Sequence, residues 1–366
     1  MPPVPHLLRY LRALCVGTAM GTLALPLSAQ IAVTAVDYGT TVDTTNRTAG
    51  NVTYLNQYTP VEYISTSLGT YNFNGPLASA VNFRRNTSSG NPNNSTVFYQ
   101  YSSTSNGNAT VLGKGDSSPT MSEVMLSNDL TQGLRNPFAN SSSSTSSNIE
   151  RIDFYFSGGY TVQEGDAMVF FDLENVGNYG DGFRVSAFTS VGTVNGVANA
   201  PNAYANSGLL VQPGTFGNAV ATPDGSNAKY LRATTTSGDN LASGQSITTL
   251  DTNSGTPNSN DLYLVGILIR FTDLGLSVGQ TIYGYSLMAG DVTASSGSDL
   301  VNWNNSSVYL TNTDPNSWGN MDFMGFGAQI SRPVPEPSTY GALFLGAGLA
   351  CFGLRRWRAL RATPGR

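Results

Sequence analysis

The hydrophobic positions of this chain fall in short runs rich in β-branched and aromatic residues, and polar, glycine-rich stretches separate these runs. In one run, Ile152, Phe154 and Phe156 share one face of an extended segment, while Asp153 and Tyr155 share the other. This period of two predicts β-strands. The predicted strands cover 31–37, 61–67, 96–102, 151–157, 167–173, 183–189, 261–271, 281–288 and 307–311.

Residue pairs that favour tight turns lie between the runs. These pairs are Asn74-Gly75, Asn106-Gly107, Asp181-Gly182, Asn195-Gly196 and Asp224-Gly225. No stretch of residues 30–332 shows a helical period with caps. We therefore predict an all-β fold for 30–332, an antiparallel β-sandwich of jelly-roll-like type with long polar loops. The Ser-rich tract at 140–148 is interpreted as one of these loops, and a linker between two β domains is the alternative.

The first 29 residues have a different pattern. Arg9 and Arg12 precede an apolar stretch from Ala13 to Leu27, and the small residues Ser28 and Ala29 close it. A basic start, an apolar middle and a small-residue exit are the three parts of a secretory signal peptide. We therefore predict export with removal of residues 1–29, and a retained N-terminal anchor is the alternative.

A second apolar run, Tyr340 to Leu354, lies near the C-terminus. It is followed by a basic cluster that contains Arg355, Arg356 and Arg358. As a helix, 15 residues span about 22 Å at roughly 1.5 Å per residue, which is short for a hydrocarbon core of roughly 30 Å. The arginines favour a cytoplasmic C-terminus. We predict one short transmembrane helix over 339–354, joined to the body by a flexible Pro-rich link and closed by a basic end at 355–366, with a buried core helix as the alternative.

The segment before this run carries a motif made of Val334, Pro335, Glu336, Pro337 and Ser338. With the apolar span and the arginine cluster behind it, the motif closely resembles the PEP-CTERM sorting signal, and the resemblance covers residues 333–366. In that family, exosortase, a membrane protease-transpeptidase of Gram-negative bacteria, handles the tail. The resemblance implies recognition at the Pro-Glu-Pro triplet and cleavage near it, while the span holds the chain transiently in the inner membrane.

The same resemblance implies a destination at the cell surface or in the extracellular matrix, with exopolysaccharide as a candidate partner. Residues 267–292 are also similar to a stretch found in exosortase-dependent surface proteins. We therefore expect a structural or adhesive role without catalysis. The alternative is a β-sandwich module that binds or degrades carbohydrate.

Charge and composition exclude several functions for the exported body, residues 30–337. It holds all 23 acidic residues but only 11 of the 18 basic ones, so its formal charge is about −12. Such a body is a poor ligand for nucleic acid. The single histidine and both cysteines lie outside it, which excludes internal disulfides, imidazole-based nucleophilic catalysis and His/Cys zinc sites.

The densest acidic stretch spans residues 163–183. Asp172, Glu174 and Asp181 offer hard oxygen ligands near glycines, which suits Ca²⁺. The spacing is not that of an EF-hand, because Phe183 stands where the bidentate glutamate would be. We expect no other cofactor. The alternative for these acids is a solvated loop between two strands.

Aromatic residues in polar surroundings are the basis for the carbohydrate alternative. They are Tyr99, Tyr101, Tyr179, Tyr204, Trp303 and Trp318. Exposed aromatic faces beside polar groups would stack on sugar rings, and a buried pair of carboxyls in the same groove would indicate a glycoside hydrolase. Core packing of these side chains is the competing explanation.

Overall fold

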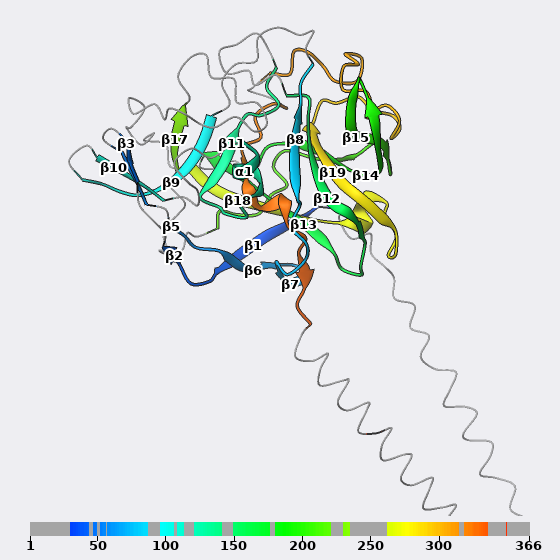
Figure 1. The fold of residues 1–366 in the computed structure, drawn as a ribbon. Helices are drawn as coiled ribbons and strands as arrows, with labels where there is room; N and C mark the ends of the chain where they lie inside the picture. Colours follow the sequence, from blue (N-terminus) through cyan, green and yellow to red (C-terminus); the bar gives the residue numbers. More distant parts are fainter. Residues whose placement is uncertain are drawn as a thin grey trace, which may run out of the picture.

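A computed structural model gives the fold of this chain (Figure 1). The residues that it describes are 30–43, 47–49, 52–55, 57–86, 96–105, 108–112, 121–140, 149–175, 180–220, 230–234, 262–314, 318–335 and Leu349. The predicted signal peptide at 1–29 lies outside the described residues, and so does the predicted span at 339–354 apart from Leu349. Among the described residues, no helix combines the length and the apolar character needed to cross a membrane.

The described chain is mostly β-structure. Its strands are β1 (Ile31–Tyr38), β2 (Val42–Asp43), β3 (Arg47–Ala49), β4 (Val52–Leu55), β5 (Gln57–Tyr58), β6 (Val61–Thr66), β7 (Gly69–Asn72), β8 (Ala80–Arg84), β9 (Thr96–Ser105), β10 (Asn108–Leu112), β11 (Gln132–Arg135), β12 (Arg151–Thr161), β13 (Ala167–Asn175), β14 (Phe183–Val194), β15 (Val197–Tyr204), β16 (Leu209–Val211), β17 (Tyr230–Thr234), β18 (Leu262–Arg270), β19 (Thr281–Ala289), β20 (Phe323–Met324) and β21 (Arg332–Pro333). The helical elements are α1 (Met121–Leu126) and the 3-10 turns η2 (Phe271–Leu274) and η3 (Gly325–Ala328).

The strands form two main sheets in the part of the chain that the structure describes. The larger sheet has 13 strands in the order β21-β7-β6-β1-β18-β13-β20-β11-β9-β10-β4-β3, with β17 beside β9, and it curls into a half-barrel (Figure 1). The smaller has six strands, β15-β14-β19-β12-β8 with β16 beside β14. Among these strands all pairs are antiparallel except β4 and β10.

The predicted mostly antiparallel β fold is confirmed, but the arrangement differs from a jelly roll. A jelly roll distributes eight strands over two sheets, whereas here one curled sheet is much larger than its partner. The physical reason is that short strands outside the predicted set, such as β20 and β21, extend the larger sheet.

The two sheets pack face to face through an aromatic core. Phe170 of β13 contacts Phe183 of β14 and Tyr285 of β19, with ring centroids 5.1 and 6.1 Å apart. Phe154 of β12 stacks on Tyr285 at 4.9 Å. The apolar face predicted for 151–157 is therefore buried between the sheets. A second cluster, which includes Val33, Ile64 and Phe171, lies on the other face of the larger sheet, because Phe171 follows Phe170 in β13 and points the opposite way.

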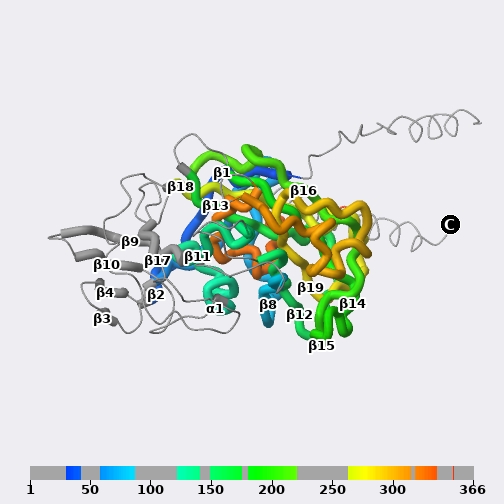
Figure 2. The backbone as a smooth tube through the Cα atoms, turned by 90° about the horizontal axis from the view of Figure 1, so that it is seen from above, coloured from blue at the N-terminus to red at the C-terminus, as the bar shows by residue number. Residues whose placement is uncertain are grey.

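The smaller sheet is covered on its outer face as well. A third cluster, here called the outer core, consists of Phe188, Val194, Ala200, Tyr204, Met288, Val292, Leu300, Trp303, Val308 and Tyr309. The irregular segment 290–314 supplies half of it, and Figure 2 shows this segment in gold and orange beside β14 and β19. The predicted strand at 307–311 is wrong, because these residues form turns whose apolar side chains cover the sheet.

Candidate functional sites

The acidic residues singled out from the sequence meet in one cluster. Asp172 and Glu174 are two apart in β13, so they lie on the same face of that strand. Asp181 stands just before β14, which belongs to the smaller sheet and faces β13 through the contact of Phe183 with Phe170. One carboxylate oxygen from each of the three residues lies within 4.8 Å of the others. The three residues considered as calcium ligands from the sequence therefore lie together in the structure.

The surroundings of the cluster differ from the solvated loop considered above. Asp172 is fully buried and Glu174 is 3% exposed, because both lie inside a strand that is covered on both faces. The Asp172 carboxylate accepts hydrogen bonds from the backbone amides of Asp181 (2.6 Å) and Asp322 (2.8 Å). These bonds fix the orientation of its two oxygens toward the neighbouring strands.

Burial and neighbouring negative charges change the pKa values of these carboxyls. Burial is the main cause that raises the pKa of Asp172 well above its usual range, and the charges of Asp181, Glu174 and Asp322 raise it further. Burial also raises the pKa of Asp181. Three carboxylates held together in low dielectric repel one another, and a divalent cation would remove that repulsion. The donor set, oxygen only, fits Ca²⁺ or another hard cation.

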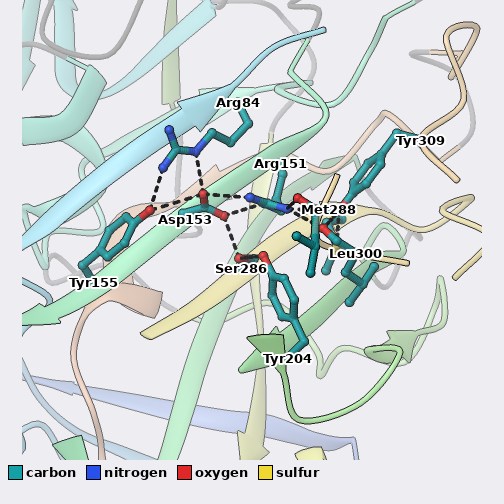
Figure 3. Close-up of polar contacts among 10 residues, drawn as sticks. Arg84, Arg151, Asp153, Tyr155, Tyr204, Ser286, Met288, Leu300 and Tyr309 are labelled. Atoms are coloured by element: carbon teal, nitrogen blue, oxygen red, sulfur yellow. Dashed lines mark hydrogen bonds and ion pairs between the residues drawn. The ribbon is translucent and has the colours of Figure 1, made fainter. Parts of the chain in front are cut away.

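A second polar cluster, here called the arginine network, lies within the smaller sheet and was missed by the sequence analysis (Figure 3). Asp153 of β12 is fully buried and receives Arg84 Nε and Arg151 Nε at 2.7 Å each. Ser286 of β19 donates its hydroxyl to the same carboxylate at 2.7 Å, and Tyr155 accepts from Arg84 Nη2 at 2.6 Å. Four strand-borne side chains thus surround one buried carboxylate.

Arg151 extends this network into the outer core. Its guanidinium lies 5.1 Å from the ring centroid of Trp303 and 5.5 Å from that of Tyr204, and it donates to the Leu300 carbonyl. Tyr309 donates to the same carbonyl at 2.7 Å. Arg151 therefore fastens segment 290–314 to the sheet.

The charged side chains of the arginine network are paired with one another, an arrangement that suits a structural role better than a catalytic one. Burial alone would raise the pKa of Asp153, but Arg151 and Arg84 outweigh it and hold this pKa below its ordinary value. Every oxygen of the carboxylate has a donor, and no part of it is exposed. We interpret the network as structural. One sequence signal was available, namely two charged residues two apart in an otherwise apolar strand.

The aromatic residues proposed for sugar stacking do not form one surface among the described residues. Tyr204 and Trp303 are buried in the outer core. Trp318 is half-buried and packs over Gly182 and Gly290, where the glycines leave room for its ring. Tyr179 lies outside the described residues, and so do the side chains of Tyr99 and Tyr101. The competing explanation, core packing, therefore holds for Tyr204 and Trp303.

The C-terminal motif begins directly at the edge of the larger sheet. Arg332 and Pro333 form β21, which pairs with β7, and the amide of Val334 donates to the Thr70 carbonyl at 2.8 Å. Pro335 follows and is exposed. The expected flexible link is therefore absent as far as residue 334. The remaining motif residues Glu336, Pro337 and Ser338, and the arginines Arg355, Arg356 and Arg358, lie outside the described residues.

Comparison with known proteins finds a match at this end of the chain. A family model described as the PEP-CTERM protein-sorting motif matches residues 333–358. No curated protein matches the chain, and no solved structure matches it either. The matched range includes the motif, the apolar run and the arginines that follow. Residues 333–358 of this chain are therefore a PEP-CTERM protein-sorting motif.

Proposed function

We propose that this chain is an exported surface or extracellular-matrix protein that an exosortase-type membrane protease sorts and releases. The observation that carries the proposal is the sorting motif at residues 333–358, which implies recognition by such a protease. The N-terminal segment 1–29 has the pattern of a signal peptide, which supports export. The chain is then held in the inner membrane through the apolar run at 339–354 until it is processed.

For the body we propose a structural or adhesive role in the envelope or matrix, with exopolysaccharide as a candidate partner. Two observations on side chains support this role. The charged side chains of the arginine network are paired and buried, and two of the aromatic residues suited to sugar stacking are buried in the outer core. A carbohydrate-active module remains the alternative function, and Trp318 is the half-buried aromatic residue that it would use.

The sorting proposal is tested with intact mass and membrane fractionation of the protein from its own cells. The wild-type chain is compared with Glu336→Ala and with Glu62→Ala, a control that removes an exposed glutamate from the body. We expect the wild type and Glu62→Ala to leave the membrane without the tail, and Glu336→Ala to stay in the membrane uncut. Retention of the whole tail in all three chains would show that the tail is a plain anchor.

We also propose that the cluster of Asp172, Glu174 and Asp181 binds Ca²⁺. The specific observation is that three carboxylate oxygens from two adjoining segments lie within 4.8 Å of one another. Calcium would join the end of β13 to the start of β14 and would stabilise the folded state. The body contains no cysteine for a disulfide, so a bound ion is one of the few cross-links open to it.

Calcium titration tests this second proposal. A ligand at 100 times its dissociation constant stabilises the folded state by about 2.7 kcal/mol. We expect the midpoint of thermal unfolding to rise when CaCl₂ replaces EGTA, and Asp172→Asn to lose most of that rise. Asp37→Asn, which replaces an exposed acid of β1 outside the cluster, should keep it. Equal responses in both variants would place the ion elsewhere.

A further inference from the structure

The sorting motif begins inside a paired strand. In β21, Arg332 lies opposite Asn72 and Pro333 lies opposite Tyr71 of β7. The next residue, Val334, still donates its amide to the Thr70 carbonyl. The family match starts at residue 333, so its first two residues belong to this edge of the sheet. The motif is thus continuous with the folded body.

The Arg332 side chain holds β21 in place in addition to the short ladder with β7. Arg332 Nε donates to Asp166 Oδ1 at 2.9 Å, and Arg332 Nη2 donates to the Tyr160 hydroxyl at 2.8 Å. Tyr160 in turn donates to Asp166, whose carboxylate also accepts the amide of Gln163. The Asp166 side chain is fully buried, while that of Arg332 is 27% exposed. We call Arg332, Asp166 and Tyr160 the clamp.

The backbone hydrogen bonds differ on the two sides of the clamp. Upstream, Ser331 exchanges two backbone hydrogen bonds with Ala167, at 2.8 and 3.0 Å, and this bridge belongs to the body. Downstream, Pro333 has no amide hydrogen to donate, so β21 depends on few hydrogen bonds. Pro333 also rests against Gly165, where an added Cβ would lie 2.6 Å from the proline ring. The clamp therefore restrains residues 332–334 in addition to their few backbone hydrogen bonds.

A protease that cuts near the Pro-Glu-Pro triplet needs an extended stretch of substrate around the cleaved bond. Recognition of extended peptides uses their main-chain hydrogen bonds. The amide of Val334 is already bonded to β7, and the sheet edge occupies the space beside it. Pro333 and Val334, the first two residues of the matched motif, are therefore occupied while β21 is paired.

We propose that β21 is a latch: it covers the upstream side of the sorting motif, and its release from β7 precedes processing by the membrane protease. Arg332, through Asp166 and Tyr160, sets the fraction of molecules in which the latch is open. This inference rests on the proposed sorting function. Local opening of a short edge strand needs far less free energy than global unfolding, so the latch opens without loss of the fold.

Replacement of Arg332 tests the latch. When opening is fast relative to cleavage, the processing rate follows the open fraction. We expect Arg332→Ala to lose its tail about tenfold faster than the wild type in a pulse-chase experiment read by intact mass, which corresponds to about 1.4 kcal/mol of latch stability. Arg184→Ala is the control, because Arg184 is a half-buried arginine in β14 of the smaller sheet, where it donates to the Gly208 carbonyl at 3.1 Å. A rate equal to or below that of the wild type overturns the proposal.

A disulfide lock tests the same idea in the opposite direction. Opposite residues of an antiparallel pair have Cα atoms about 4.5 to 5.5 Å apart, which a disulfide spans. The double variant Asn72→Cys, Arg332→Cys is made with Cys351→Ser, so that the chain without residues 1–29 contains only the new pair. We expect no processing when the pair is oxidised, and faster processing than in the wild type after reduction. Processing of the oxidised form at the wild-type rate would exclude a latch.

One further variant separates failure of the latch from failure of the sorting proposal. If the wild type and Glu336→Ala both stay uncut, the sorting function is wrong and the latch with it. If the wild type is cut, Glu336→Ala is not, and Arg332→Ala matches the wild type, then only the latch is wrong. Thermal unfolding of each variant checks that the body remains folded.

Discussion

The arginine network gives the sharpest stability prediction. Asp153→Asn keeps the shape of the side chain but removes the one negative charge between Arg84 and Arg151 (Figure 3). Both guanidinium groups stay in place, because Trp303 packs against both of them and the Leu300 carbonyl accepts a hydrogen bond from Arg151. The variant therefore leaves two cations close together in a region where Arg151 has no exposed surface.

The magnitude follows from burial. Removing one partner of a buried ion pair costs about 3 to 5 kcal/mol, because the remaining charge is desolvated without compensation. Two arginines depend on Asp153, so we expect a loss toward the upper end of this range, about 4 to 5 kcal/mol. An exposed pair contributes about 0 to 1 kcal/mol. Asp273→Asn, which breaks the more exposed pair with Arg270, is the matched control.

Urea unfolding of the purified protein at neutral pH measures both changes as differences in the free energy of unfolding. Tryptophan fluorescence is a suitable signal, because Trp303 lies against both arginines. A loss below about 1 kcal/mol for Asp153→Asn, or equal losses in Asp153→Asn and Asp273→Asn, would refute the assignment of this carboxylate as the centre of the network.

Two further predictions concern single buried positions. Burial raises the pKa of Glu150 to about 8, so its contribution to stability is present below the ordinary carboxyl pKa and is lost as pH rises toward 8. Glu150→Gln is the reference, because it keeps the acceptor for the amide of Asn86. Relative to this variant, the wild type should lose about 4 kcal/mol of unfolding free energy between pH 5 and pH 9. A difference between the two proteins that does not change with pH would contradict this. Gly284→Ala should lower the free energy of unfolding by about 3 kcal/mol or more, because its Cβ would lie 1.9 Å from the Phe154 carbonyl oxygen. Gly279→Ala, with open space around it, should lower it by only about 1 kcal/mol, and thermal unfolding measures both changes.

The chain pattern predicted the strands well where a run of β-branched and aromatic residues lies between turn residues. Strands β6, β12, β13, β14, β18 and β19 all fall within two residues of the predicted starts. The pattern failed at 307–311, where Val308 and Tyr309 form part of a turn-rich cover instead of a strand. Periodicity reports which side chains are buried, and a cover of turns buries apolar residues as well as a strand does.

The two polar clusters differ in how much of them the sequence supplied. Asp172, Glu174 and Asp181 are near one another in the chain, so the sequence already offered them as one candidate set. Asp153 and Ser286 are 133 residues apart, and only the pairing of β12 with β19 brings them together. The same holds for the clamp, in which Arg332 reaches Asp166 across 166 residues.

The sequence by itself determined the β class of the body, its lack of cysteine and histidine chemistry, and the sorting motif at its C-terminus, because these depend on local composition, period and order. The tertiary structure alone decided how the strands divide between a half-barrel and a smaller sheet, which charges are buried, and that the motif starts within a paired edge strand. These features depend on contacts between residues far apart in the chain. Their free energy comes from burial and from pairing across the sheets, which local patterns do not record.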